Sequence, residues 1–465
     1  MSIALQLSSR QSAVRRRRAR SRGAGRRKGR QSKRLSVQPA ADAAEYGSGY
    51  GVGYRDGVQA GIQRFGGLFE GTSIVIPTYN QLPLLQQCIE SISACTRLPH
   101  EIIVVDNGSA DGTAAYLQSL GGRVRSRVLD SNRGFAGAIN VGMLMAKGTT
   151  IVLLNNDTLV TDNWLDNMLA CLSSDEKIGM VGPVTNYISG EQQIAVPYSA
   201  VKDMPGFARS YNLHDPARWR RTDRLVGFCL LFRRELFEGV GYFDEGFLTG
   251  NFEDDDFGVR VRLLGKSLVI AEDTFIHHYG SISMKALGEQ FMVVNNRNES
   301  YFSDKWHSPE EWIFKVLQHP LAQGRTLPGS AWLYPERVAV QGFGPHVYWI
   351  EGGQRRRIEG VVGLPVTRVS QVDLRRWPVG DIIAVEEAER RWRGADNEWQ
   401  AGVVMLPDGA AYHVEGHHIR RIVTPSALFL WNLNAKPCQM TTPESLAGKM
   451  EGLPIIAPPQ IRYSL

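Results

Sequence analysis

From Thr72 onward the chain alternates short β-rich runs with helical patterns, and this alternation limits the fold more than any other feature. The runs TSIVIP, EIIVVD and TTIVLLN are bounded by turn-forming residues. Between the first two runs, the apolar residues at helical spacing are Leu85, Cys88, Ile89 and Ile92. Strands that alternate with helices predict an α/β domain with a mostly parallel central sheet and helices on both faces.

The remaining segments differ from this texture in composition. Residues 1–45 are rich in Arg, Ser and Gly, which predicts a disordered basic tail, and residues 46–71 read as a Gly- and Tyr-rich linker. The α/β domain is expected to span 72–305 and to be followed by a helical linker at 306–330. Residues 331–465 are punctuated by Pro and Gly and are predicted to form a small β-rich module.

The β-rich module contains an internal repeat. VYWIEGGQRRRIEG (347–360) aligns with AYHVEGHHIRRIVT (411–424) at an offset of 64 residues. Each copy reads as a strand, a Gly turn and a second strand, which is the pattern of a β-hairpin. We interpret the match as a duplication, with a chance similarity of two hairpins as the alternative.

Charge is unevenly distributed along the chain. Residues 1–34 hold 13 Lys and Arg and no acidic residue, so the rest of the chain carries 40 basic and 47 acidic residues. The basic tail predicts weak contact with an anionic surface. Five cysteines without a CxxC pair favour reduced thiols, and no apolar run reaches the roughly 18 residues of a membrane span. We therefore expect a cytoplasmic protein, peripheral at most at the inner face of a membrane.

Polar residues follow the predicted strands, where ligands bind in open α/β sheets. Tyr79 and Asn80 follow the strand that ends at Pro77, and Asp106 and Asp157 follow the next two. Asp106 can accept a hydrogen bond from the imide N–H of uracil, thymine or guanine, and Tyr79 can stack on a base. Asp157 has the chemistry of a Mg²⁺ or Mn²⁺ ligand whose shell is completed by phosphates. Taken singly, Asp106 is equally well read as a turn residue, and a lone Asp157 is more often a helix N-cap or turn residue.

Two further clusters carry possible chemistry. Glu253–Asp256 opens a predicted helix, and successive helical residues turn by about 100°, so only one or two of these acids can face a cleft. Asp256 is expected to pair with Arg260 at i, i+4. A charged first turn favoured by the helix dipole is the alternative. His277 and His278 follow a strand-like run and read as a metal ligand or as structural residues.

In this order, the motifs resemble family-two glycosyltransferases over residues 72 to about 305. The motifs that carry the resemblance are SIVIPTYNQLPLLQQCIESI, EIIVVDNGSADGT, NRGFAGAINVGMLMAKG, LLNNDT, GFCLLFRRELFEGVGYFDEGFLTGNFEDDDFGVRVRLLG and IHHYGS. Bacterial rhamnosyl- and galactofuranosyl-transferases are the most similar branch. The resemblance implies a GT-A type fold, a single domain that binds a nucleoside-diphosphate sugar.

The resemblance also implies roles for individual residues. The nucleotide pocket would comprise Pro77, Tyr79, Asn80, Asp106, Asn132, Arg133 and Asn156. Asp157 would hold the metal, because the first acid of the Asp-x-Asp motif is Asn155 here. His278 would join the metal, with His277 as second choice, and Asp254 would be the catalytic base.

The implied activity is inverting transfer of a hexosyl or deoxyhexosyl group. The donor would be a UDP- or dTDP-sugar, and the acceptor a carbohydrate, lipid-linked or protein hydroxyl in bacterial cell-surface polysaccharide or glycoconjugate synthesis. A divalent metal, Mg²⁺ or Mn²⁺, would assist. The alternatives are a non-catalytic nucleotide-sugar-binding scaffold and an anionic-polymer-binding protein acting through the basic tail. No GxGxxG motif follows a strand, which argues against an oxidoreductase.

Overall fold

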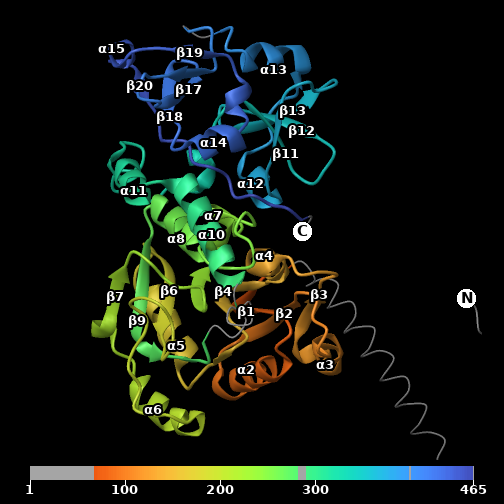
Figure 1. Ribbon diagram of the computed structural model, residues 1–465, viewed down its shortest axis with the longest axis vertical. Coiled ribbons are helices and arrows are strands. Elements are labelled where there is room, and N and C mark those ends of the chain that lie inside the picture. Colours follow the sequence, from red (N-terminus) through yellow and green to blue (C-terminus); the bar gives the residue numbers. More distant parts are fainter. Residues whose placement is uncertain (1–66, 281–287, 289, 397–398, 464–465) are drawn as a thin grey trace, which may run out of the picture. The chain divides into compact units, whose positions relative to one another are not determined.

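The predicted sheet is present in the computed structural model, which describes residues 67–280, 288, 290–396 and 399–463. Eight strands follow the order β3-β2-β1-β4-β8-β6-β9-β7 (Figure 1), and all but β8 and β7 run in one direction. The strands are β1 (Phe69–Thr78), β2 (His100–Asp106), β3 (Arg125–Val128), β4 (Gly148–Leu154), β6 (Ile178–Val184), β7 (Trp219–Thr222), β8 (Cys229–Arg233) and β9 (Ser267–Phe275). The predicted α/β domain with a mostly parallel sheet is therefore confirmed.

Alternate residues of the central strands enter separate cores on the two faces of the sheet. Ile74 and Ile76 of β1 pack with residues of α2 (Leu82–Cys95) and α5 (Trp164–Ser174). Val75, which lies between them, packs with residues of α4 (Gly134–Met145) and other helices. Figure 1 shows α2 and α4 on opposite sides of β1 and β2. The other helices of this region are α3 (Thr113–Ser119), α6 (Met204–Tyr211), α7 (Arg234–Val240) and α8 (Glu253–Leu263).

The predicted segment boundaries need two adjustments. β1 begins at Phe69, inside the segment predicted as a linker, because Phe69 already pairs with Gly148 of β4. The basic tail and residues 46–66 lie outside the described residues. The segment predicted as a helical linker is not a spacer: α11 (Pro309–Gln318) packs against α8 and buries its apolar face in the core.

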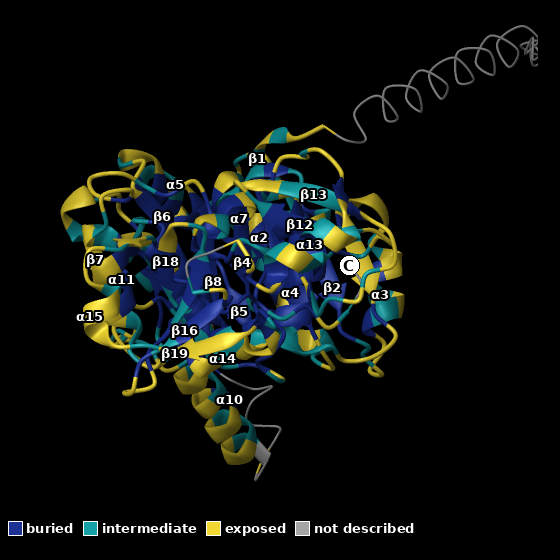
Figure 2. Ribbon diagram, turned by 90° about the horizontal axis from the view of Figure 1, so that it is seen from above, coloured by how far each residue is buried: buried dark blue, intermediate teal, exposed yellow. Residues whose placement is uncertain are grey.

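A long helix precedes this segment. α10 (Gln290–Trp306) has exposed surface along much of its length (Figure 2) but ends in the fully buried Trp306. In the ranges that the structure describes, we find no helix with the length and apolar composition needed to cross a membrane.

The β-rich module consists of two five-stranded sheets with equivalent strand orders, β14-β11-β12-β13-β15 and β19-β16-β17-β18-β20. The aligned sequence repeats form the central hairpins, so the predicted repeat module is confirmed. The first sheet comprises β11 (Val338–Gln341), β12 (Val347–Glu351), β13 (Gln354–Glu359), β14 (Val366–Arg368) and β15 (Ile383–Ala384). The second comprises β16 (Val403–Met405), β17 (Ala411–Glu415), β18 (His418–Arg421), β19 (Cys438–Met440) and β20 (Met450–Glu451). The module's helices are α12 (Gln371–Arg376), α13 (Val385–Trp392), α14 (Pro425–Leu430) and α15 (Pro443–Leu446).

The end of the chain returns from the module to the α/β domain. The backbone of Gln460 forms two hydrogen bonds with the segment after α7. Its N–H donates to the side-chain Oδ1 of Asp244, and its carbonyl accepts from the Glu245 N–H. The backbone N–H groups of Arg462 and Tyr463 donate to Glu245 Oε2 at 2.7 and 3.2 Å. Residues 68–465 accordingly form one compact unit.

A buried ionic cluster connects this return segment to α8. Lys305 Nζ lies 2.6 Å from both Asp244 Oδ2 and Asp256 Oδ1, and all three side chains are fully buried. Arg260 Nε donates to Asp256 Oδ2, which confirms the predicted i, i+4 pair. Burial pushes the pKa of Asp256 upward, but the charges of Lys305 and Arg260 outweigh it and hold that pKa below its ordinary value.

Replacement of Lys305 by Met should therefore be strongly destabilising, because it leaves two buried carboxylates short of a cation. We expect the free energy of unfolding to fall by about 3–5 kcal/mol, measured by chemical denaturation. Lys315→Met is the matched control, since Lys315 forms an ion pair of the same length, 2.6 Å, with Glu311 on the exposed surface. That control should lose less than about 1 kcal/mol. Equal losses in the two variants would contradict the importance of the cluster.

Candidate active site

A cleft of about 410 Å³ lies at the carboxyl ends of β1 and β4 and beside the first turn of α8. Eight of the ten site residues expected from the sequence line it. These are Pro77, Tyr79, Asn80, Asn132, Asn156, Asp157, Asp254 and His278. Asp106 and Arg133 are outside the lining, for different reasons.

Asp106 lies just behind the wall of the cleft. It ends β2 beside Thr78 of β1, and both Thr78 and the next residue, Asn107, line the cleft. The side chain is fully buried, and Oδ1 accepts a hydrogen bond from the Ser109 N–H at 2.9 Å. Oδ2 is also buried but has no hydrogen-bond partner among the described residues. A buried carboxylate oxygen without a donor is costly, so this atom calls for an external N–H or O–H.

Asn80 and Tyr79 form the outer wall of the cleft. Asn80 has a left-handed backbone with φ of 50°, and its Oδ1 accepts a hydrogen bond from the Ala110 N–H at 2.7 Å. This hydrogen bond fixes the loop after β1 against the loop after β2. Tyr79 is 41% exposed, so its ring is available for stacking.

Hydrogen bonds from the Asn107 amide hold Asn132 and Arg133 so that their side chains point to different places. Asn107 Nδ2 donates to Asn132 Oδ1 at 2.9 Å, and Asn107 Oδ1 accepts from the Arg133 N–H. Asn132 thus faces the cleft, whereas the Arg133 guanidinium lies 4.8 Å from the centre of the Tyr463 ring. The cation–π contact with the returning chain end explains why Arg133 does not line the cleft.

Asp157 and His278 are brought together by a two-stranded sheet. β5 (Thr158–Leu159) and β10 (His277–His278) pair antiparallel, and His278 Nε2 lies 3.2 Å from Asp157 Oδ1. His278 Nδ1 donates to the Tyr187 carbonyl at 2.7 Å, so in the neutral ring Nε2 presents a lone pair to the carboxylate. Two facing lone pairs need a proton or a cation between them, and a carbonyl on the far ring nitrogen is the usual support of a metal-bound histidine.

These two residues fit a divalent cation only in part. Among the described residues no group of three or more His, Cys, Asp and Glu side chains is placed to hold a metal ion. A cation at Asp157 and His278 would therefore need further oxygen ligands from a substrate and water. The neighbouring His277 accepts or donates a hydrogen bond at Tyr198 Oη instead, and burial lowers its pKa to about 4.

The four acids of α8 separate as the helical rotation requires. Asp254 and Glu253 line the cleft, Asp255 forms two hydrogen bonds with the guanidinium of Arg224, and Asp256 enters the buried ionic cluster. Burial, together with the charge of Asp255, raises the pKa of Asp254 to about 6. Asp254 Oδ2 accepts from the Gly227 N–H at 2.7 Å, and Oδ1 accepts from the Asp255 N–H at 3.0 Å. The carboxylate is thus held in one orientation.

The loop that leads into α8 has an unusual backbone. Thr249, Asn251 and Phe252 have φ of 65°, 80° and 71°, a region that residues other than Gly rarely occupy. The buried Asn298 of α10 holds this loop. Its Nδ2 group donates to three backbone carbonyls of the loop, those of Leu248, Gly250 and Asn251. Such a backbone persists only where neighbours over-determine it, and this is typical of functional sites.

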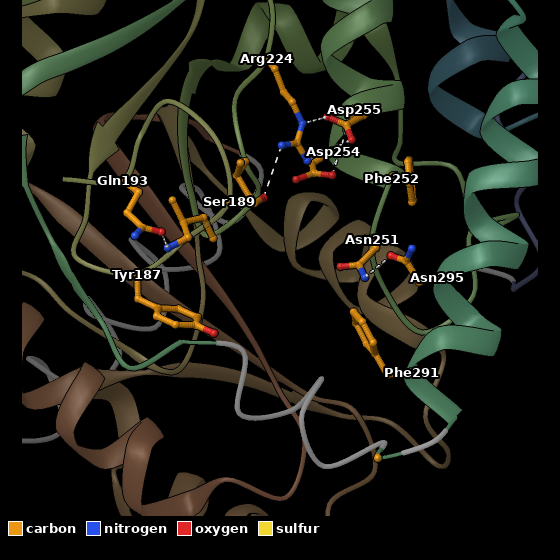
Figure 3. A pocket seen from close by; sticks show the side chains of 13 residues that line it. Tyr187, Ser189, Gln193, Arg224, Asn251, Phe252, Asp254, Asp255, Phe291 and Asn295 are labelled. Atoms are coloured by element: carbon orange, nitrogen blue, oxygen red, sulfur yellow. Dashed lines mark hydrogen bonds and ion pairs between the residues drawn. The ribbon is translucent and has the colours of Figure 1, made fainter. Parts of the chain in front are cut away.

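A second, larger cavity of about 710 Å³ adjoins the cleft (Figure 3). The two cavities share Ile188, Val226, Asn251 and Asp254. Figure 3 shows aromatic rings and amide groups around the second cavity, with the Arg224–Asp255 pair next to Asp254. The other labelled residues are Tyr187, Ser189, Gln193, Phe252, Phe291 and Asn295. Asp254 therefore lies where the two cavities meet.

Several lining residues were not expected from the sequence. Asn107 had a detectable signal, because it directly follows Asp106 at a strand end. Gly227 opens one of the quoted motifs, but the sequence does not mark it as the donor to Asp254, and Arg224 lies outside those motifs. Asn251 lines both cavities because of the loop backbone before α8, which Asn298 of α10 holds although it lines neither cavity.

Comparison with known proteins agrees with this architecture. A family model described as Glycosyl transferase family 2 matches residues 73–241. An uncharacterized protein of Sinorhizobium fredii, y4gI, is 32% identical over 46% of this chain and 25% of its own length. The O-antigen biosynthesis protein RfbC of Myxococcus xanthus is 30% identical over 46% of this chain and 18% of its own length. The chain thus spans a quarter or less of these two relatives.

Other matches cover more of the related protein. The N-acetylglucosaminyl-diphospho-decaprenol L-rhamnosyltransferase of Mycobacterium tuberculosis is 23% identical over 52% of this chain and 88% of its own length. Among solved structures, GalNAc-T7 with UDP, GalNAc and Mn²⁺ is 18% identical, with a TM-score of 0.40, over 52% of this chain and 50% of its own.

Proposed function

We propose that this chain, whose residues 73–241 match the Glycosyl transferase family 2 model, transfers a sugar from a nucleoside-diphosphate donor to an acceptor hydroxyl with inversion. The observation that carries the proposal is the position of Asp254 between the two cavities. A base at this junction can act on an acceptor in one cavity while the donor occupies the other. The names of the relatives in Myxococcus and Mycobacterium support a role in cell-surface polysaccharide or glycoconjugate synthesis.

The donor is proposed to be a UDP- or dTDP-sugar. Uracil and thymine carry an imide N–H that complements the unpartnered Oδ2 of Asp106, and the exposed Tyr79 ring can cover the base. Adenine and cytosine lack the imide donor. Asn132 and Asn156 supply further amides on the path from the base toward Asp157.

Asp157 and His278 would hold a divalent cation, Mg²⁺ or Mn²⁺, together with oxygens of the donor diphosphate. Such a cation, when bound, neutralises negative charge that grows on the leaving diphosphate. The residues of the chain have separate tasks. The Tyr187 carbonyl fixes the tautomer of His278, and Asn156 Nδ2 donates to Thr78 Oγ1 and so fixes the loop after β4 against β1.

Asp254 is proposed as the general base. An acceptor hydroxyl oxygen forms a bond to the anomeric carbon while the bond from that carbon to the diphosphate breaks on the opposite face. The electron pair of the broken bond leaves with the diphosphate, and Asp254 takes the hydroxyl proton. An ordinary aspartate pKa near 4 would make this a weak base, and burial brings the pKa of Asp254 closer to neutrality.

The acceptor is proposed to occupy the larger cavity and to be a carbohydrate terminus. The rings of Phe252, Phe291 and Tyr187 can pack on the apolar faces of sugars, and the amides of Gln193, Asn251 and Asn295 can bind hydroxyl groups (Figure 3). The alternative function, a non-catalytic nucleotide-sugar-binding scaffold, would make no use of a held carboxylate with a raised pKa at this place.

Asp254→Asn should abolish transfer and leave donor affinity almost unchanged, because the amide keeps the shape but cannot take a proton. General-base catalysis is typically worth about 10²–10⁴-fold, so the rate should fall by that factor or more. Steady-state transfer and calorimetric donor binding would be measured together. Asp255→Asn is the comparison: Asp255 bonds Arg224 and lines the larger cavity, not the donor cleft, so above pH 7, where the Asp254 carboxylate is ionised, its rate loss should be much smaller. A dead Glu253→Gln beside an active Asp254→Asn would assign the base to Glu253 instead.

The pH dependence of transfer should report the raised pKa of Asp254. The base is active only as the carboxylate, so kcat/KM should rise about tenfold per pH unit below about 6 and level off above it. The charge of Asp255 raises this pKa and that of Arg224 lowers it. The midpoint of the profile should therefore move to lower pH in Asp255→Asn and to higher pH in Arg224→Gln. Midpoints that stay fixed in both variants would rule out Asp254 as the titrating group.

Nucleotide binding should depend on both Asp106 and a cation. In calorimetry we expect UDP to bind at least tenfold more tightly than ADP, and a chelator to weaken UDP binding. Asp106→Asn should reduce the preference for UDP over ADP, because one side-chain oxygen becomes a donor. Asp157→Asn should reduce the effect of the chelator while the nucleotide preference persists. Equal binding of UDP and ADP would contradict the assigned base pocket.

A further inference from the structure

A small cavity in the first sheet of the β-rich module has a lining that is basic and aromatic. It measures about 160 Å³ and lies among the β11–β12 turn, the β12–β13 hairpin and α12. None of the residues that line it is acidic. The lining residues are Gly342, Gly344, His346, Tyr348, Arg355, Gln371, Leu374 and Arg375.

The duplicated hairpin provides an internal reference for this cavity. Arg355 pairs across the strands with Ile350, and at the equivalent register of the second repeat Ile419 pairs with Val414. Ile419 is only 3% exposed, so the second repeat fills the position with an apolar core residue. The first repeat instead places a cation there. His346 differs in the same way, since the offset of 64 residues aligns it with Ala410.

The positive charge of Arg355 is poorly compensated at this position, which an apolar core residue occupies in the second repeat. Its Nη1 donates to the Leu374 carbonyl at 2.7 Å, and its guanidinium carbon lies 5.6 Å from the centre of the Tyr348 ring. Its Nε is buried and has no acceptor within the part of the chain that the structure describes. One carbonyl does not balance a partly buried guanidinium, for which a carboxylate or phosphate is the matching partner.

Two acids close to these arginines in the sequence are already engaged. Asp373 of α12 accepts from Arg376 Nη1 and from Ser370 Oγ. Glu351 pairs with Arg337 and Arg391. Arg375 has no ion-pair or hydrogen-bond partner among the residues described, and its side chain is exposed at the mouth of the cavity. The cavity therefore has two guanidinium groups and no carboxylate of its own.

From these contacts we propose that the first repeat of the module is a binding site for an oxyanion, a carboxylate or phosphate group. Arg355 and Arg375 would supply charge-assisted hydrogen bonds, and Gln371 and Tyr348 would supply neutral ones. The volume suits one such group with part of the saccharide that carries it. The second repeat has lost or never acquired the site, because Ile419 occupies the place of Arg355. The site uses no residue of the donor cleft, so it does not depend on the proposed transfer.

The test measures binding to the full chain by calorimetry at low ionic strength. The probes are inorganic phosphate, glucose 6-phosphate, glucuronate and, as the uncharged reference, glucose. No nucleotide or Mg²⁺ is added, because UDP carries phosphate groups that the proposed site would itself bind. We expect the three anions to bind and glucose not to bind. Binding of inorganic phosphate without the other probes would identify the free ion as the ligand. Binding of glucose 6-phosphate and glucuronate would identify a charged saccharide.

Two variants assign the binding to this cavity. Arg355→Ile copies the second repeat. Arg375→Gln changes an exposed side chain that has no hydrogen bond or ion pair among the described residues. Each should weaken anion binding about tenfold or more. Arg393→Gln, at an exposed arginine after α13, is the matched control and should change it less than about twofold. Thermal melting verifies that each variant is folded. Anion binding that is unchanged in Arg375→Gln, or glucose binding equal to that of glucuronate, would overturn the proposal.

Discussion

The contact between Lys305 and the two carboxylates of Asp244 and Asp256 determines the geometry on which the site depends. Asp256 is in the first turn of α8, and its carboxylate is held from inside the core by Lys305, by Arg260 and by the Trp306 Nε1–H. Once this residue points inward, rotation by about 100° per residue directs Asp254, two residues earlier, to the other side of the helix. The same cluster joins α10 and the returning chain end to α8, so the acids cannot turn away without exposing buried charge.

Two opposing influences act on Asp254. The N-terminus of a helix favours a negative charge, and the Gly227 N–H adds a direct hydrogen bond to it. Burial and the charge of Asp255 disfavour the ionised form, and they prevail, since the pKa of Asp254 is raised to about 6. Arg224 moderates the result because it neutralises Asp255 through two hydrogen bonds. The pair of Arg224 and Asp255 thus works as an adjustable charge next to the carboxylate, at the boundary of the two cavities.

Much of the cleft could be predicted from the sequence because strand ends are local features. β-rich runs that stop at Asp106 and Asp157 put both residues at one edge of a parallel sheet, and the structure has them there. Arg133 shows where this reasoning stops. The preceding residue, Asn132, lines the cleft as predicted. The Arg133 side chain instead packs on the ring of Tyr463, more than 300 residues away in the sequence. The left-handed backbone of Thr249 is equally non-local, because Asn298 of α10 bonds the residues on either side of it, Leu248 and Gly250.

The same limit applies to residues 306–330, which were predicted as a helical linker and do contain a helix. A short amphipathic helix between two domains has the composition of a spacer and of a core element alike, and only its partner decides between them. Here α8 is that partner, so α11 packs against the helix that carries the acids. The β-rich module is then not a tethered appendage. Through α11, the buried Lys305 and the returning chain end, the module and the cleft share one core, while the module's two sheets are free to differ at their surfaces, as Arg355 and Ile419 do.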